Sequence, residues 1–200
     1  MLISFEGIDG CGKSTQIDLL KKYFKKKGIE YSVFREPGGT GISERIRSLL
    51  LHETEVMDPV TELLLFSAAR SQLIQEKVLP LLKDDKIVIL DRFFDSTTAY
   101  QGYGRRSAGL DSINVLNDLA THHTVPDLTF YLKIDPKEAE KRTAGTLKDR
   151  MENSGAQFFS DVSKGYDELA KKEKRIHSID ATLSPQEIHT QIIDIIESSS

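Results

Sequence analysis

The sequence predicts an α/β fold in which a five-stranded parallel sheet is flanked by helices. Short β-prone apolar segments recur along the chain, and helical patterns separate each segment from the next. The length of 200 residues suits one domain with its own core. We therefore expect residues 1–200 to form a single doubly wound domain, with a short lid at about residues 143–157.

The expected strands are short, and two of them, IVIL and LTFYL, are almost entirely apolar. Such runs are typical of strands that are covered on both faces. The strands are expected at about residues 2–5, 30–35, 87–90, 128–132 and 175–179.

The helices are expected from apolar residues that recur at helical spacing. In the first of them, Ile17, Leu20 and Phe24 share one face, the outer face is rich in lysine, and Gly28 ends the pattern. The segment 59–82 is apolar around much of its circumference, and Pro80 is expected to kink or end it. The other helices are expected at about residues 41–51, 112–121, 136–142, 157–174 and 185–197.

A glycine-rich motif lies between the first strand and the first helix. It fits G-x-x-x-x-G-K-[ST], the pattern of a phosphate-binding P-loop, and it has the strand and helix that such a loop requires. Its backbone N–H groups and the helix N-terminus would bind the phosphates of ATP. The expected ATP-binding residues are Gly7, Ile8, Asp9, Gly10, Cys11, Gly12, Lys13, Ser14 and Thr15.

Within this loop, Lys13 would reach the β- and γ-phosphates, and the Ser14 hydroxyl would hold Mg²⁺. Cys11 is either a reactive thiol or a small residue that fills space in the loop. A second Mg²⁺ ligand is expected at Asp91, where the apolar strand IVIL ends, as in a Walker-B motif. Arg92 would then point into the crevice at the carboxyl edge of the sheet, or pair with an acid at the surface.

The composition excludes several classes of protein. The net charge of −4 argues against a nucleic-acid partner bound by a basic surface. No apolar run approaches the ~18 residues of a membrane span, and no signal peptide is visible. The single cysteine precludes an intrachain disulfide and fits a cytoplasmic protein.

The segment DRFFDSTTAYQGYGR combines arginines, aromatic rings, hydroxyls and an amide. This composition suits a second, nucleotide-sized substrate, although a loop that binds a protein partner has a similar composition. A nucleotide-dependent switch is disfavoured, because guanine-recognition and switch motifs do not occur at fitting places.

The sequence as a whole resembles the thymidylate kinases of the bacterial kind. The motifs FEGIDGCGKST, REPGGTGISERIRSLLL, ELLLFSAARSQ, DRFFDSTTAYQGYGR and PDLTFYLKIDP occur in order along nearly the whole chain. REPGGT together with the segment STTAYQG is highly specific, whereas a P-loop alone indicates only a superfamily. The resemblance implies a P-loop NTPase fold, a homodimer, and phosphorylation of dTMP to dTDP by ATP and Mg²⁺ for dTTP and DNA synthesis.

The resemblance also implies roles for the residues of an acceptor site. Phe66 would stack on the thymine, and Arg70, on the same helix face, would hydrogen-bond it. Glu36 and Pro37 would wall the base pocket, Asp9 would bind the 3′-hydroxyl, and Tyr100 would crowd the 2′ position. Arg47 and Arg92 would neutralise the acceptor phosphate, and Thr97 and Gln101 would complete the thymine and sugar contacts.

Some members of this family carry a basic residue inside the P-loop, where this chain has Gly10 and Cys11. The other arrangement supplies a cation from the lid, so we expect Arg150, then Arg142, then Lys148 to approach the transferred phosphoryl group. Another nucleoside monophosphate kinase remains the alternative enzyme, and a nucleotide-dependent switch is the alternative from another class.

Overall fold

A computed structural model describes residues 1–53, 55–145 and 149–199. Its five strands form one sheet in the order β2-β3-β1-β4-β5, and all neighbouring pairs are parallel. The strands are β1 (Leu2–Glu6), β2 (Tyr31–Arg35), β3 (Ile87–Asp91), β4 (Leu128–Lys133) and β5 (Ile176–Asp180). The predicted fold class is thus confirmed, and each strand lies within one residue of its expected bounds.

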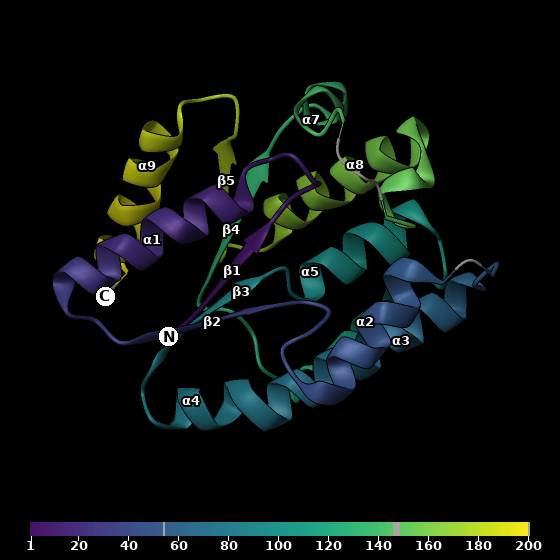
Figure 1. The fold of residues 1–200 in the computed structure, drawn as a ribbon, viewed down its shortest axis with the longest axis horizontal. Coiled ribbons are helices and arrows are strands. Elements are labelled where there is room, and N and C mark those ends of the chain that lie inside the picture. The colour runs from purple at the N-terminus through teal and green to yellow at the C-terminus, as the bar shows by residue number, and fades with distance from the viewer. Residues whose placement is uncertain (54, 146–148, 200) are drawn as a thin grey trace.

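Helices cover both faces of the sheet, as Figure 1 shows. On one face, α1 (Lys13–Lys27) and α9 (Pro185–Ser198) pack side by side over a core that includes Ile3 and Phe5. On the other face, α3 (Pro59–Leu73) and the segment after it cover Leu2, Val88 and Leu90. The remaining longer helices are α2 (Gly41–His52), α6 (Leu110–Ala120), α7 (Pro136–Arg142) and α8 (Ala156–Lys172).

The long helix expected at residues 59–82 continues through Pro80 instead of ending there. A π-helical segment, η1 (Ile74–Val78), follows α3, and α4 (Leu79–Lys83) begins one residue before the proline. The N–H of Leu79 donates to the carbonyl of Ile74, which is the five-residue spacing of a π-helix, and this wider turn lies directly before the proline, which has no N–H to donate. Pro80 therefore marks the point where one helix passes into the next.

The polar segment after β3, where no helix was expected, is helical. It forms α5 (Phe94–Thr97) and the π-helical η2 (Thr98–Gly104), where the N–H of Arg105 donates to the carbonyl of Tyr100 at 2.7 Å. Single turns of π-helix occur frequently at functional sites. This geometry points Tyr100 and Gln101 inward, and both side chains are buried.

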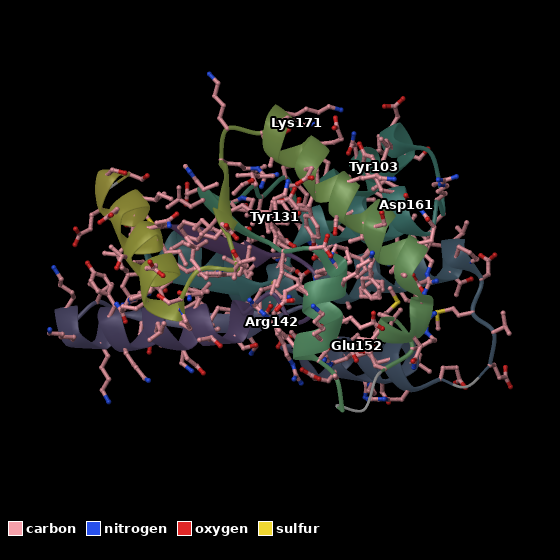
Figure 2. All side chains as sticks on the ribbon, turned by 90° about the horizontal axis from the view of Figure 1, so that it is seen from above. Tyr103, Tyr131, Arg142, Glu152, Asp161 and Lys171 are labelled. Carbon is pink, nitrogen blue, oxygen red and sulfur yellow. The ribbon has the colours of Figure 1, made fainter. Side chains whose placement is uncertain are left out.

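The expected lid is described only in part. Residues 149–155 form a turn and the short 3₁₀ helix η3 (Glu152–Ser154), and Met151 is 6% exposed. Figure 2 labels Arg142 and Glu152, which lie on the two segments that flank residues 146–148. Among the described residues, no helix is long and apolar enough to cross a membrane.

Candidate active site

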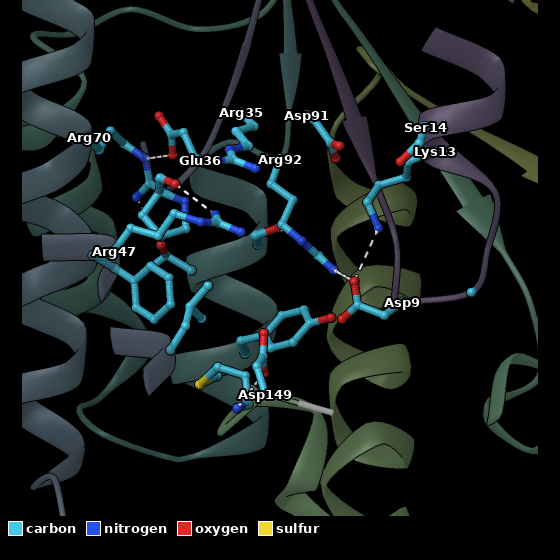
Figure 3. A pocket seen from close by; sticks show the side chains of 18 of the residues that line it. Asp9, Lys13, Ser14, Arg35, Glu36, Arg47, Arg70, Asp91, Arg92 and Asp149 are labelled. Atoms are coloured by element: carbon cyan, nitrogen blue, oxygen red, sulfur yellow. Dashed lines mark hydrogen bonds and ion pairs between the residues drawn. The ribbon is translucent and has the colours of Figure 1, made fainter. Parts of the chain in front are cut away.

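A cavity of about 430 Å³ lies at the carboxyl edge of the sheet, between the P-loop, the end of β3 and α3. Figure 3 shows arginines and carboxylates from these elements converging on it. Because parallel strands end at the same edge, the P-loop after β1 and the residues after β3 become neighbours here. Its lining includes Asp9, Gly10, Gly12, Lys13, Ser14, Thr15, Glu36, Pro37, Arg47, Phe66, Arg70, Asp91, Arg92, Thr97, Tyr100, Gln101 and Arg142.

The P-loop has the backbone that its glycines permit. Gly7 has a φ of 132°, and a Cβ at this position would lie 2.7 Å from the carbonyl oxygen of Leu132. Gly12 has a φ of 98° and directly precedes α1. Residues that carry a side chain rarely adopt these backbone conformations, so the curvature of the loop depends on glycine.

Two further P-loop residues, Ile8 and Cys11, are buried behind the loop. Cys11 is 1% exposed within the hydrophobic core, which agrees with the interpretation of a small residue that fills space.

Lys13 is folded back onto the loop. Its ammonium donates to the carbonyl of Gly7 at 3.0 Å and lies 3.9 Å from Oδ1 of Asp9. The side chain is only 7% exposed. A buried ammonium at a helix N-terminus is a favourable site for phosphate oxygens.

Asp9 also receives a hydrogen bond from Arg92, whose Nη2 lies 2.7 Å from the same Oδ1. Burial by itself would raise the pKa of Asp9, but the Arg92 and Lys13 cations outweigh burial and lower the pKa to about 2. Asp9 is therefore ionised throughout the physiological range and can accept hydrogen bonds but cannot act as an acid.

Arg92 is held on several sides. Its Nη1 donates to the carbonyl of Gly7 at 2.9 Å, and its guanidinium lies 5.0 Å from the ring centre of Tyr100. The hydroxyl of Tyr100 is buried and has no hydrogen-bond partner among the described residues. Burial raises the pKa of Tyr100, so this hydroxyl is a neutral donor.

The other end of the cavity is organised by Arg70, which is 2% exposed. Its Nε donates to Oε2 of Glu36 at 2.7 Å, its Nη1 donates to Oγ1 of Thr97 at 2.8 Å, and its Nη2 donates to the carbonyl of Phe93. The peptide bond between Glu36 and Pro37 is cis.

Oε1 of Glu36 is buried without a partner among the described residues, and Phe66 lines the same part of the cavity. This end therefore combines an apolar ring with an oriented guanidinium and a free acceptor.

Two predicted residues have additional partners. Arg47 lies on α2, and its Nη1 donates to the carbonyl of Pro37 at 2.8 Å. Gln101 donates from Nε2 to Oε1 of Glu62 at 2.9 Å. Both side chains therefore line the cavity and are held in place by these hydrogen bonds.

The three expected lid cations differ in placement. Arg142 lines the cavity and donates from Nη1 to the carbonyl of Ala181 at 3.0 Å. Arg150, expected first, faces elsewhere: its Nη1 lies 2.7 Å from Oε2 of Glu62, and its Nε donates to the carbonyl of Leu50. Glu62, which is far from Arg150 in the sequence, is only 1% exposed. A carboxylate buried to this extent needs a cation as its partner, and Arg150 provides it. Lys148 lies outside the described residues.

Ser14 and Asp91, the expected Mg²⁺ ligands, both line the cavity. The described residues contain no group of three or more His, Cys, Asp or Glu side chains that could hold a metal by themselves. A hydroxyl and a carboxylate beside a phosphate-binding loop nevertheless suit Mg²⁺, which typically takes one or two protein oxygens together with substrate phosphates.

Some lining residues were not expected from the sequence. Arg35 borders the cavity next to Glu36, and its Nη2 lies 3.5 Å from Oε2 of Glu44. Its signal was available, since it begins the REPGGT motif. Asp149 and Met151 also line the cavity, and their polar, aperiodic surroundings in the sequence gave no comparable signal.

The thymidylate kinase family model matches residues 5–192. The chain belongs to the thymidylate kinase family. It is 50% identical over 208 residues to a thymidylate kinase of Chlorobaculum tepidum, an alignment that covers 98% of this chain and 97% of that one. It is 45% identical over 196 residues to one of a Thermoanaerobacter species, covering 98% and 96%.

The crystal structure of thymidylate kinase from Ehrlichia chaffeensis has the same fold, with a TM-score of 0.80 and 36% identity over 98% of each chain. Membership of the family confirms the enzyme class expected from the sequence, a dTMP kinase, over a nucleotide-dependent switch.

Proposed function

We propose that this chain phosphorylates dTMP to dTDP with ATP and Mg²⁺, as a cytoplasmic homodimer, in the formation of dTTP for DNA synthesis. One observation carries the assignment of its residues: Lys13 of the P-loop and Arg92 of the acceptor side approach the same oxygen of Asp9, at 3.9 and 2.7 Å. Cations for the donor and the acceptor phosphates therefore lie next to each other in one cavity.

In this proposal the donor binds the P-loop. The N–H groups of the loop and of the α1 N-terminus receive the phosphates of ATP, and Lys13 moves from the carbonyl of Gly7 to a phosphate oxygen. Ser14 and Asp91 would hold Mg²⁺, which would supply positive charge to the phosphates of ATP. Both residues line the cavity beside Lys13.

The acceptor, dTMP, occupies the part of the cavity beyond Asp9. Phe66 stacks on the thymine, Arg70 donates to a carbonyl of the base, and Glu36 and Pro37 form the wall of its pocket. Arg70 is suited to this role because Glu36 and Thr97 already fix the plane of its guanidinium. Asp9 and Tyr100 bind the sugar, Thr97 and Gln101 complete the contacts, and Arg47 and Arg92 bind the phosphate.

The chemistry needs charge neutralisation rather than a base. A phosphate monoester has its second pKa near ~6, so the acceptor is mostly a dianion at pH 7. The obstacle is repulsion between two anionic substrates, which Lys13 and Arg92 reduce by holding both phosphates in line. We propose Arg142 as the further cation, because it lines the cavity and Arg150 does not.

The homodimer is supported by an apolar surface on three neighbouring helices. Leu49 on α2, Leu64 on α3, and Val115 and Leu119 on α6 are between 48% and 71% exposed. Helix α3 contacts both α2 and α6, so these side chains lie on adjoining elements. Exposed apolar residues gathered on neighbouring helices are typical of a contact between subunits.

A coupled assay of ADP release with a panel of nucleoside monophosphates tests the activity. We expect dTMP to be used better than AMP or dCMP by at least about 10³-fold in kcat/KM, because a mismatched base leaves buried polar groups unpaired. We expect dUMP to fall behind by only about 10–200-fold, the value of one methyl group. Chelation of Mg²⁺ should abolish turnover, and equal use of AMP and dTMP would contradict the assignment.

A further inference from the structure

Glu6, the last residue of β1, is a buried carboxylate that the expected site did not include. It is 1% exposed and accepts three hydrogen bonds. The N–H of Phe93 donates to Oε1 at 2.7 Å, and Oε2 receives the hydroxyls of Ser96 at 2.6 Å and Tyr166 at 2.9 Å. A buried carboxylate needs such partners. Two of them, Phe93 and Ser96, closely follow Arg92 in the chain, and the third, Tyr166 of α8, lies against the Arg92 guanidinium.

The backbone of Arg92 is in the left-handed region, with a φ of 69°. Residues other than glycine adopt this conformation rarely and need support from their surroundings. The two N–H groups around this position are both held by β1: that of Arg92 donates to the carbonyl of Phe5 at 3.0 Å, and that of Phe93 donates to Glu6. Glu6 thus fixes the peptide that directs the Arg92 side chain into the cavity.

Glu6 also acts on the Arg92 guanidinium through the two hydroxyls. Nη1 of Arg92 lies 3.3 Å from Oγ of Ser96 and 3.5 Å from the hydroxyl oxygen of Tyr166. When both hydroxyls donate to Glu6, their lone pairs face Arg92 as acceptors. The carboxylate therefore sets the polarity of the surface against which the guanidinium rests.

We propose that Glu6 is a positioning residue that aims Arg92 at the phosphate of the acceptor nucleotide. This inference rests on the proposed function, in which Arg92 binds that phosphate. Its consequence is specific: loss of the Glu6 acceptor weakens the recognition of the phosphate and leaves the recognition of the base and of ATP intact.

The phosphate contribution can be measured as the ratio of the dissociation constants of thymidine and dTMP, by calorimetry without ATP at about pH 8.5, above the range in which folded Glu6 holds its proton. Glu6→Leu removes the acceptor at similar volume and should lower this ratio at least about tenfold, the value of a hydrogen bond to a charged group. Glu6→Gln keeps an acceptor for the N–H of Phe93 but places an amide donor against the hydroxyls of Ser96 and Tyr166, so it should lower the ratio less than Glu6→Leu does, by about threefold. The dissociation constants of ATP and thymidine should change by less than about twofold in both variants.

Tyr166→Phe removes one donor to Glu6 without a cavity, so it serves if Glu6→Leu does not fold; it should lower the ratio about threefold. Tyr131→Phe, whose ring stacks on that of Tyr166 at 5.0 Å, is the matched control and should leave the ratio unchanged. In an Arg92→Ala background, Glu6→Leu should have less than about a twofold effect.

The outcomes separate the two proposals. A wild-type protein that binds thymidine and dTMP equally would contradict the role of Arg92, and hence the proposed function of this site. A normal wild-type ratio that persists in Glu6→Leu, or in Tyr166→Phe where the former is unfolded, would overturn the positioning role alone.

Discussion

Arg92 donates to Asp9 across 2.7 Å, and this contact joins the residues after β3 to the P-loop after β1. The carboxylate lowers the electrostatic cost of placing Arg92 and Lys13 close together. When phosphates arrive, they can replace Asp9 as the partner of either cation. The geometry therefore supports a site in which two anions are brought together by cations that are already neighbours.

Lys13→Ala should lower kcat by at least about 10²-fold with an unchanged fold, because the ammonium tracks charge that develops in the transition state. Steady-state kinetics together with circular dichroism checks this. Lys21→Ala is the matched control, since Lys21 lies on the exposed face of the same helix and pairs with Asp18. A near-normal kcat in the Lys13→Ala variant would contradict the role proposed for the P-loop in catalysis.

Arg70→Ala should weaken dTMP binding with little change in the KM of ATP, and it should also destabilise the fold. It leaves the buried Glu36 carboxylate without its cation, which costs roughly 3–5 kcal/mol of unfolding free energy. The double variant Arg70→Ala with Glu36→Gln should recover part of the stability but not the affinity. If the double variant binds dTMP normally, Arg70 does not recognise the base.

The lid cations are distinguished by Arg142→Ala and Arg150→Ala. Arg142→Ala should lower kcat at least about 10²-fold, since an arginine that stabilises the transition state can be worth ~10³-fold. Arg150→Ala should instead lower the melting temperature, because it leaves Glu62 without its 2.7 Å partner. Glu62→Gln in the Arg150→Ala protein should restore stability. The reverse pattern, with Arg150 controlling kcat, would indicate that the Glu62 pair breaks during turnover.

Glu6 should make stability depend on pH in an unusual direction. Burial, followed by the charge of Asp95, raises its pKa from 4.5 to about 7, against the effects of Ser96 and Arg92. Between these pH values the unfolded chain has released the proton and the folded protein holds it, so the contribution of Glu6 to stability falls as pH rises. Arg175 pairs with Asp95 at 2.6 Å and moderates this charge.

Chemical denaturation of the wild type and of Glu6→Gln from pH 4.5 to 7.5 measures this contribution. The difference in unfolding free energy, wild type minus variant, should decrease by up to about 3 kcal/mol as pH rises through this window. A difference that grows with pH would mean that the carboxylate is stabilised, not destabilised, in its ionised form.

The apolar surface on α2, α3 and α6 should govern assembly. Val115→Glu combined with Leu119→Glu should shift the protein to monomers in analytical ultracentrifugation, because charges are costly in a buried interface. Ile29→Glu is a matched control: Ile29 is also partly exposed, at 37%, but lies in the connection after α1. A wild-type protein that sediments as a monomer would refute the homodimer.

The strands and the P-loop were predictable because their signals are local. Five apolar segments and one glycine-lysine motif place β1, β3 and the residues that follow them at one edge of the sheet. The helical conformation of residues 94–104 was not predictable, since its aspartate, serine, threonines and glycines all have low helix propensity. It depends on long-range packing: Tyr100 contacts Phe158 and Tyr166, whose ring centres lie 5.8 and 6.3 Å away.

The placement of Arg150 depends on a pairing partner 88 positions earlier in the chain, which no local pattern reveals. The role of Glu6 could not be predicted for a related reason. A single acidic residue at the end of an apolar strand has no recognisable role until the fold brings the backbone N–H of Phe93 within hydrogen-bond distance of it. Residues whose function depends on such contacts require the folded structure.

The glycine that opens the P-loop has a consequence for the variation that this chain can tolerate. Any side chain at position 7 would meet the carbonyl of Leu132 in β4, at 2.7 Å for the first carbon. The curvature of the phosphate loop and its close approach to β4 therefore both depend on the absence of a side chain at this residue. Redesign of the nucleotide specificity of this enzyme must keep glycine at that position, because a side chain there would displace the loop or β4 whichever nucleotide is bound.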